Sequence, residues 1–167
     1  MIILGIDPGI AIVGYGLVEV NGGRLCARDY GCIRTANTKP AATRLAAIYD
    51  NLNKVIKANN PQVMAIEELF FNKNSRTVIA VGQARGVALL AAAHAGLTIA
   101  EYTPLEVKQA VTGVGRASKE QVQRMVQVLL KLDSIPRPDD TADALAVAIC
   151  HASFAPWRLQ QQGAERQ

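Results

Sequence analysis

Four carboxylates occupy positions from which they could bind metal ions together. Asp7 follows the apolar run 2–6, and Glu67 ends the apolar run 63–67. If both runs are central strands, the two carboxylates meet at one end of a sheet. Asp140 and Asp143 are three positions apart, so on a helix they project from the same side. Together these acids could form a site for divalent cations.

Each acid also has a structural explanation. Asp7 lies in Asp-Pro-Gly, an ordinary turn sequence, and Asp139 or Asp140 could cap the last helix. Asp143 is harder to explain, because a charge inside an otherwise apolar helix needs a partner. The register of this pair stays open, since Asp139 and Asp143 are four positions apart and also share a helix face.

Bringing such carboxylates together requires a counter-charge. At about 5 Å, two of them repel by roughly 3 kcal/mol at an effective dielectric constant of 20. No lysine or arginine adjoins these acids in the sequence, so divalent metal is the natural neutraliser. Oxygen-only ligands favour Mg²⁺, with Mn²⁺ as the alternative, over zinc.

Other catalytic chemistries lack support. The histidines and cysteines (His94, His151, Cys26, Cys32 and Cys150) are scattered without metal-ligand spacing, and no Gly-x-Ser-x-Gly motif occurs. An acid cluster holding two Mg²⁺ ions beside a basic surface suggests phosphodiester hydrolysis. One ion would activate water and the other would stabilise the departing 3′ oxygen.

The charge distribution favours a nucleic-acid partner. The chain has 18 Lys and Arg against 14 Asp and Glu, a net charge of +4. Residues 72–119 hold six cations and only two acids, Glu101 and Glu106, so this central third also has a net charge of +4. Converging segments would give a phosphate-facing surface. Its six cations are Lys73, Arg76, Arg85, Lys108, Arg116 and Lys119.

The elements that must position these groups form an α/β pattern. With 167 residues, half of them hydrophobic and 19% charged, the chain suits one globular domain and excludes a disordered or coiled-coil protein. Apolar runs predict a strand meander over 2–35, then alternating helices and strands, and three final helices ending near 153. We expect a mixed five-stranded sheet flanked by helices, spanning 1–154, and a polar, flexible tail over 155–167. The strands are expected at 2–6, 13–20, 24–35, 63–67 and 97–100, and the helices at 45–59, 75–94, 104–113, 118–130 and 140–153.

Two further patterns bear on partners. Gly82 and Gly86 share one face of the helix expected over 75–94, which indicates close helix–sheet packing or, alternatively, a subunit contact. No apolar run approaches the roughly 18 residues of a membrane span, and the start lacks the features of a signal peptide. We therefore expect a cytoplasmic protein without a membrane partner.

Five motifs resemble those of the RuvC family, the bacterial Holliday-junction resolvases, in order and spacing over residues 1 to about 154. The resemblance implies an RNase H-like fold and a Mg²⁺-dependent crossover junction endodeoxyribonuclease of recombination and DNA repair. It also implies a homodimer that nicks two opposed strands of a four-way junction, working with the branch-migration proteins RuvA and RuvB. The motifs are Gly-Ile-Asp-Pro-Gly at 5–9, Ala-Ile-Glu-Glu-Leu-Phe-Phe at 65–71, Gly-Gln-Ala-Arg-Gly-Val at 82–87, Val-Lys-Gln-Ala-Val at 107–111 and Asp-Thr-Ala-Asp-Ala-Leu-Ala at 140–146.

Residue roles carry over from this resemblance. The family's four catalytic, metal-binding carboxylates match Asp7, Glu67, Asp140 and Asp143. An aromatic residue that stacks on bases matches Phe70, with Phe71 adjacent, and DNA-contacting lysines match Lys108 and Lys119. Charge alone suggests that Lys73, Arg76 and Arg116 also contact DNA.

Three other functions are compatible with parts of the sequence. Another RNase H-like nuclease, acting on RNA or RNA–DNA hybrids, would use the same acids. A junction-binding protein without catalysis is a second alternative. Gly-Ile-Asp-Pro-Gly also resembles the phosphate-binding opening of sugar-kinase and actin-like ATPases, but those need two such domains. A homodimer suits a junction with two-fold symmetry, because each chain carries one carboxylate cluster.

Overall fold

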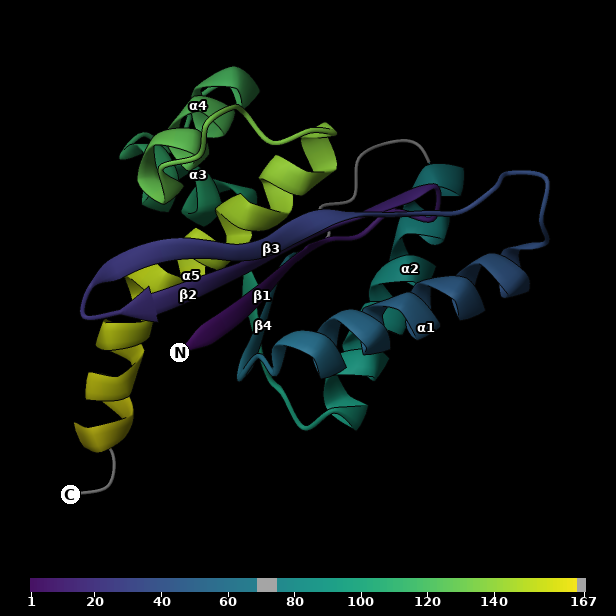
Figure 1. Cartoon of the computed structure of the whole chain (residues 1–167), viewed down its shortest axis with the longest axis horizontal. Coiled ribbons are helices and arrows are strands. Elements are labelled where there is room, and N and C mark those ends of the chain that lie inside the picture. Colours follow the sequence, from purple (N-terminus) through teal and green to yellow (C-terminus); the bar gives the residue numbers. More distant parts are fainter. Residues whose placement is uncertain (69–74, 165–167) are drawn as a thin grey trace.

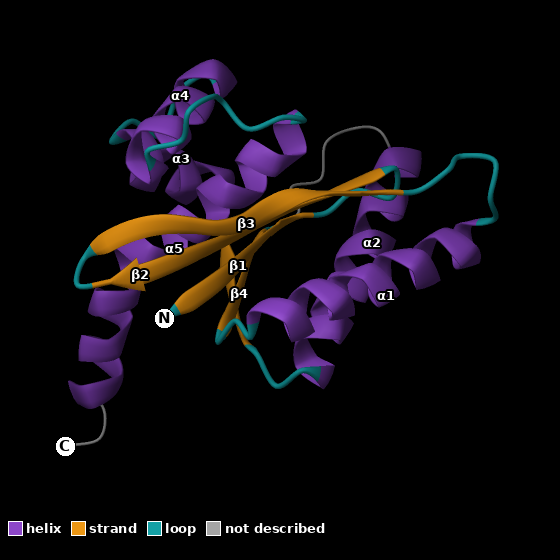
Figure 2. Cartoon of the chain, in the orientation of Figure 1, coloured by secondary structure: helices purple, strands orange, loops and turns teal. Residues whose placement is uncertain are grey.

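The computed structural model describes residues 1–68 and 75–164, and the side chains of 1–68 and 78–154. Within these residues, five strands form one sheet in the order β3-β2-β1-β4-β5, with five helices around it (Figures 1 and 2). The strands are β1 (Ile2–Asp7), β2 (Ile12–Asn21), β3 (Arg24–Arg34), β4 (Val63–Glu67) and β5 (Thr98–Tyr102). The helices are α1 (Ala41–Asn59), α2 (Ser75–His94), α3 (Pro104–Thr112), α4 (Lys119–Leu130) and α5 (Asp139–Ala164).

The sheet is mixed, which confirms the predicted fold class. Strands β1, β2 and β3 form an antiparallel meander, while β4 pairs with β1 and with β5 in parallel. The turn between β2 and β3 works because Gly22 and Gly23 both take positive φ angles, as a tight hairpin turn requires. Parallel pairing matters for the site, because it brings the carboxyl ends of β1 and β4 to the same edge.

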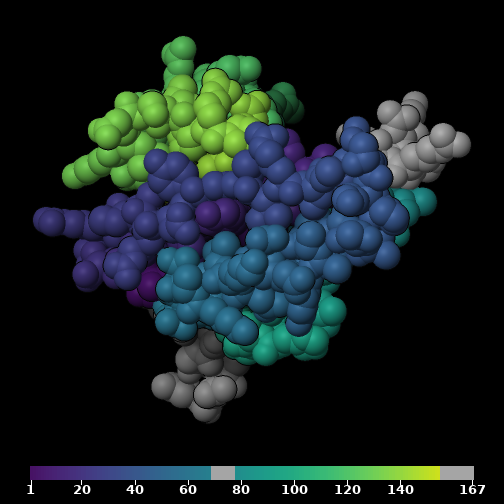
Figure 3. Space-filling model, turned by 45° about the vertical axis from the view of Figure 1, so that its right-hand side comes forward, coloured from purple at the N-terminus to yellow at the C-terminus, as the bar shows by residue number. Residues whose placement is uncertain are grey.

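Helices cover both faces of the sheet. Helices α1 and α2 lie on one face, over a core that includes Leu4, Ile6 and Ile66. Helices α3, α4 and α5 lie on the other face, over Ile3 and Ala65. Figure 3 shows the green layer of α3–α5 on one side of the purple strands and the blue and teal layer of α1 and α2 on the other.

Helix α5 lies unusually close to the strands, because glycines remove the side chains that would hold it away. A Cβ atom on Gly5 would lie 2.0 Å from the Ala144 carbonyl oxygen, and one on Gly14 would lie 1.9 Å from the Asp140 carbonyl oxygen. Glycine inside a strand often marks such an approach. Gly5 and Gly14 therefore let the helix that carries two of the acids rest against β1 and β2.

Two expectations from the sequence are wrong. Helix α5 continues to Ala164 instead of ending near Ser153, so residues 155–164 of the expected tail are helical. Polar composition does not oppose a helix, and Gln, Arg and Leu are good helix formers. Gly86 does not serve helix–sheet packing, because it is exposed and a Cβ there would meet nothing within 4 Å. The buried face of α2 consists of Ala84, Ala88, Ala91 and Ala92.

The structure also answers the question of membrane spans for the part of the chain it describes. There, none of the helices combines the length and the hydrophobicity that crossing a bilayer requires.

Candidate active site

Two of the predicted acids end neighbouring parallel strands. Asp7 is the last residue of β1 and Glu67 is the last of β4, and the pairing of Ile6 with Ile66 sets them side by side. Asp7 also pairs with Gly14 of the neighbouring strand β2, and Asp140 lies over this glycine. The structure therefore brings the strand acids to the sheet edge that the sequence predicts, beside the start of α5.

The four acids are close enough for burial and mutual charge to raise the pKa values of three of them: Asp7, Glu67 and Asp143. Burial, followed by the charges of Asp143, Asp140 and Glu67, raises the pKa of Asp7 from 3.8 to about 7. Burial and the charge of Asp143 raise the pKa of Glu67. Burial also raises the pKa of Asp143, against the opposing effect of Lys119. Such mutual perturbation of ionisable groups in a cleft is typical of functional sites.

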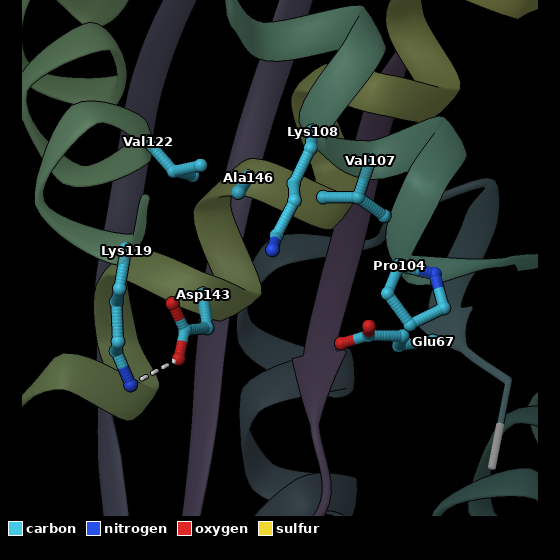
Figure 4. A pocket seen from close by; sticks show the side chains of 8 residues that line it. All are labelled: Glu67, Pro104, Val107, Lys108, Lys119, Val122, Asp143 and Ala146. Carbon is cyan, nitrogen blue, oxygen red and sulfur yellow. Dashed lines mark ion pairs between the residues drawn. The ribbon is translucent and has the colours of Figure 1, made fainter. Parts of the chain in front are cut away.

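Two lysines project into this cluster from the α3–α4 layer. The Nζ atom of Lys119 lies 2.9 Å from Asp143 Oδ2. Lys119 begins α4, after the Ser118 cap, so the capping box at the start of this helix places the cation at the site. Lys108, on α3, lowers the pKa of Glu67. Figure 4 shows the two ammonium groups on either side of Asp143, with Glu67 across the space from them.

Lys119 itself is bound to the acids rather than free. Burial alone would lower its pKa, but the hydrogen bond and charge of Asp143, with the charges of Asp139 and Asp7, raise it. Lys119 thus supplies part of the counter-charge in the structure, whereas the sequence pattern predicts metal as the only neutraliser. No sequence neighbour of the acids indicated this contact, because Lys119 precedes Asp143 by 24 positions.

The structure places the two adjacent aspartates differently. Asp139 forms an ion pair with Arg137 and lies 3.6 Å from Lys119 Nζ, with 42% of its side chain exposed. Asp140 lies over Gly14 and is among the charges that raise the pKa of Asp7. Asp140 is therefore the member of the doublet that faces the strand acids.

A cavity of about 230 Å³ opens beside the cluster. Glu67, Asp143, Lys108 and Lys119 provide its charged walls, and apolar side chains from α3, α4 and α5 provide the rest (Figure 4). The apolar lining consists of Pro104, Val107, Val122 and Ala146. A charged mouth against an apolar wall suits a ligand that carries both a phosphate and a sugar or base.

The donor set fits Mg²⁺ or Mn²⁺ better than zinc, because the cluster offers carboxylate oxygens and no imidazole or thiol. Among residues 1–68 and 75–164, no three His, Cys, Asp or Glu side chains already surround a single metal-sized point. The acids repel one another without metal, and Asp143 is held by Lys119. The carboxylates are therefore close together but do not converge on one point.

The two histidines take part in contacts of their own. His94 accepts or donates a hydrogen bond with the Tyr49 hydroxyl (2.7 Å), and His151 does so with the Tyr102 hydroxyl (2.8 Å). Arg116 is exposed in the loop between α3 and α4. Three predicted DNA-contacting residues, Phe70, Phe71 and Lys73, lie outside the described residues, and of Arg76 only the backbone, in α2, is described.

Sequence reasoning missed one determinant of the site, Gly14. The signal was present, because Gly14 and Gly16 interrupt an apolar strand pattern. A glycine in a strand indicates a bulge or a close backbone approach but does not say which segment approaches.

Comparisons with known proteins agree on one family. The family model described as "Crossover junction endodeoxyribonuclease RuvC" matches residues 3–151. The proteins of that name from Moorella thermoacetica and Pelotomaculum thermopropionicum are 67% and 58% identical, covering 97% and 94% of this chain and 97% and 96% of their own. The structure "T. thermophilus RuvC in complex with Holliday junction substrate" has a TM-score of 0.90 and 38% identity, over 95% of this chain and 96% of that one. The chain that builds this carboxylate cluster therefore belongs to the RuvC family of crossover junction endodeoxyribonucleases.

Proposed function

We propose that this protein resolves four-way DNA junctions by paired, symmetric nicks through metal-dependent phosphodiester hydrolysis. The observation that carries the proposal is the convergence of Asp7, Glu67, Asp140 and Asp143 at one sheet edge, with burial and mutual charge raising the pKa of Asp7 to about 7. Family membership supplies the substrate class, since the related Thermus thermophilus protein is described in complex with a Holliday junction.

The four carboxylates would hold the metal. Two bound divalent ions supply the chemistry of activating a water molecule and stabilising the departing 3′ oxygen. Asp7 must lose a proton before it can act as a ligand below pH 7, because its pKa is about 7. Glu67 and Asp143, whose pKa values are also raised, strengthen this requirement.

The two lysines are suited to the scissile phosphate. Lys108 and Lys119 line the same cavity as Glu67 and Asp143, so a phosphate that enters it meets two cations beside the ligands. With Asp143 engaged as a metal ligand, the Lys119 ammonium group would be available to the phosphate. We assign further DNA contacts to Arg116, and to Phe70, Phe71, Lys73 and Arg76 on the resemblance and on charge.

The proposed homodimer has a candidate interface on α2. Ile79 and Leu90 are 64% and 48% exposed, and with exposed Gln83 and Gly86 they follow the spacing of one helix face. Large apolar side chains exposed on one face of a helix commonly mark a protein contact. Gly86 adds no side chain to this face, so another helix can approach closely. We propose that a second copy of the chain covers it, with one carboxylate cluster per subunit facing each opposed strand.

The proposed function also implies partner proteins and a cellular location. Junction resolution follows branch migration, so we propose that the protein works with RuvA and RuvB in recombination and repair. The related proteins come from bacteria, and a chromosomal substrate would place this one in the bacterial cytoplasm.

The experiment that tests the substrate uses a labelled four-way junction with Mg²⁺ or Mn²⁺, beside linear duplex and an RNA–DNA hybrid. We expect paired nicks on the junction alone. Cleavage of the hybrid would keep the metal chemistry and refute the substrate, whereas binding without cleavage in either metal would leave a junction-binding protein.

A further inference from the structure

Arg85 makes both of its described contacts at the carboxyl ends of β4 and β5. Its Nε donates a hydrogen bond to the Glu67 carbonyl oxygen (3.4 Å), and its guanidinium forms an ion pair with Glu101. Only 15% of the Arg85 side chain is exposed. Its charge predicts a place on the phosphate-facing surface, but these contacts turn Arg85 toward the interior of its own subunit.

Arg85 and strand β5 together hydrogen-bond both polar groups of one peptide. The N–H of Glu68 donates to the Tyr102 carbonyl on β5 (2.8 Å). The N–H and C=O of a trans peptide point in opposite directions, so the peptide joining Glu67 to Glu68 is bonded at both ends. Strand β5 holds its N–H and Arg85 holds its C=O. Rotation of this peptide would turn the Cα atom that carries the Glu67 carboxylate.

Arg85 acts from the face of the sheet opposite the carboxylate. Helix α2 packs on the face that contains Ile66, and Glu101, which pairs with Ile66, points to that same face. Residues alternate along a strand, so Glu67 projects to the other face, where it lines the cavity with Asp143. Arg85 therefore reaches the backbone of Glu67 without competing for its side chain.

We propose that Arg85 is a positioning residue that holds the Glu67 carboxylate in place for metal binding, through the carbonyl of the same residue. This inference rests on the proposed function, in which Glu67 is a metal ligand. Removing a residue that orients a metal ligand without touching the metal commonly weakens metal binding about 10- to 100-fold.

The test measures Mn²⁺ binding to the DNA-free protein by electron paramagnetic resonance of the unbound ion. Arg85→Gln should bind Mn²⁺ about 10- to 100-fold more weakly than the wild type. The matched control is Arg28→Gln, which loses the same charge and an ion pair with Glu19 (3.2 Å) on β2, and it should bind like the wild type. Glu101→Gln removes the ion pair but keeps the carbonyl contact, so its affinity should also stay near the wild-type value.

Three outcomes would overturn the inference. Unchanged Mn²⁺ affinity in Arg85→Gln refutes a positioning role, and an equal loss in Glu101→Gln assigns the effect to the ion pair instead of the carbonyl. A wild-type protein that binds no Mn²⁺ refutes the proposed metal site itself, and the inference with it. If Arg85→Gln does not fold, Arg85→Lys replaces it: this variant keeps the charge but loses the planar guanidinium, and it should still bind Mn²⁺ more weakly than Arg28→Lys.

Discussion

Replacing Asp7 with Asn should stabilise the metal-free protein at alkaline pH, although it removes a residue of the proposed catalytic site. The raised pKa means that the folded protein holds the Asp7 proton more tightly than the unfolded chain. Its contribution to stability is complete below pH 3.8 and is lost as the pH rises through about 7. The difference of about 3 between the two pKa values corresponds to about 4 kcal/mol.

Asn resembles the protonated acid and does not titrate. The variant and the wild type should therefore have similar free energies of unfolding near pH 4, and the advantage of the variant should grow up to pH 7. At pH 8 we expect an advantage of about 2–4 kcal/mol, since rearrangement of the neighbouring acids reduces the full value. Urea denaturation in EDTA at several pH values measures this directly.

Magnesium should reduce the stability advantage of the variant. A ligand that binds only the folded state stabilises it by about 2.7 kcal/mol at 100 times its dissociation constant, and Asp7→Asn should lose most of this gain. The matched control is Asp50→Asn, at an exposed position on α1. Equal or lower stability of Asp7→Asn at pH 8 in EDTA, or an advantage independent of pH, would refute the electrostatic reasoning.

Three other variants examine separate parts of the account. Gly14→Ala places a Cβ 1.9 Å from the Asp140 carbonyl oxygen, so it should lower the free energy of unfolding by about 3 kcal/mol, as measured in urea; a cost below about 1 kcal/mol would mean that α5 can move away freely. Lys119→Ala should shift the pH midpoint of Mn²⁺ binding upward in calorimetric titrations, because Lys119 lowers the pKa values of Asp7, Glu67 and Asp143, and an unchanged midpoint would contradict that role. Leu90→Glu should convert a dimer to monomers in sedimentation velocity without unfolding the chain, and a dimer that persists would exclude this face of α2 as the interface.

The order and type of the elements could be predicted from local patterns. Apolar runs of five residues predict β1 and β4. Thr103 with Glu106, and Ser118 with Gln121, have the spacing typical of helix starts, and both capping boxes form. The positions of Asp7 and Glu67 at strand ends followed from the same runs. These features depend on residues close together in the sequence, so one sequence contains the information.

Features that depend on packing between distant segments could not be predicted. The choice between Asp139 and Asp140 depends on where α5 rests, since both aspartates share a helix face with Asp143. The contact over Gly14 sets Asp140 toward Asp7, whereas Asp139 pairs with Arg137. Likewise, the contact of Lys119 with Asp143 depends on how α4 packs against α5. The length of α5 could not be predicted either, because Pro156 and the polar residues after it are equally typical of a tail, although the helix continues to Ala164.

The proposed function requires that each chain carries one metal-dependent cluster, which cuts one strand of a junction. Mixed dimers, with one wild-type and one Asp7→Asn subunit separated by different affinity tags, test it most directly on a junction labelled in both opposed strands. The account predicts that each mixed dimer nicks one strand in Mg²⁺ and leaves the junction unresolved, while wild-type dimers cut both strands. Two nicks by the mixed dimer, or cleavage by a dimer with Asp7→Asn in both subunits, would contradict the account.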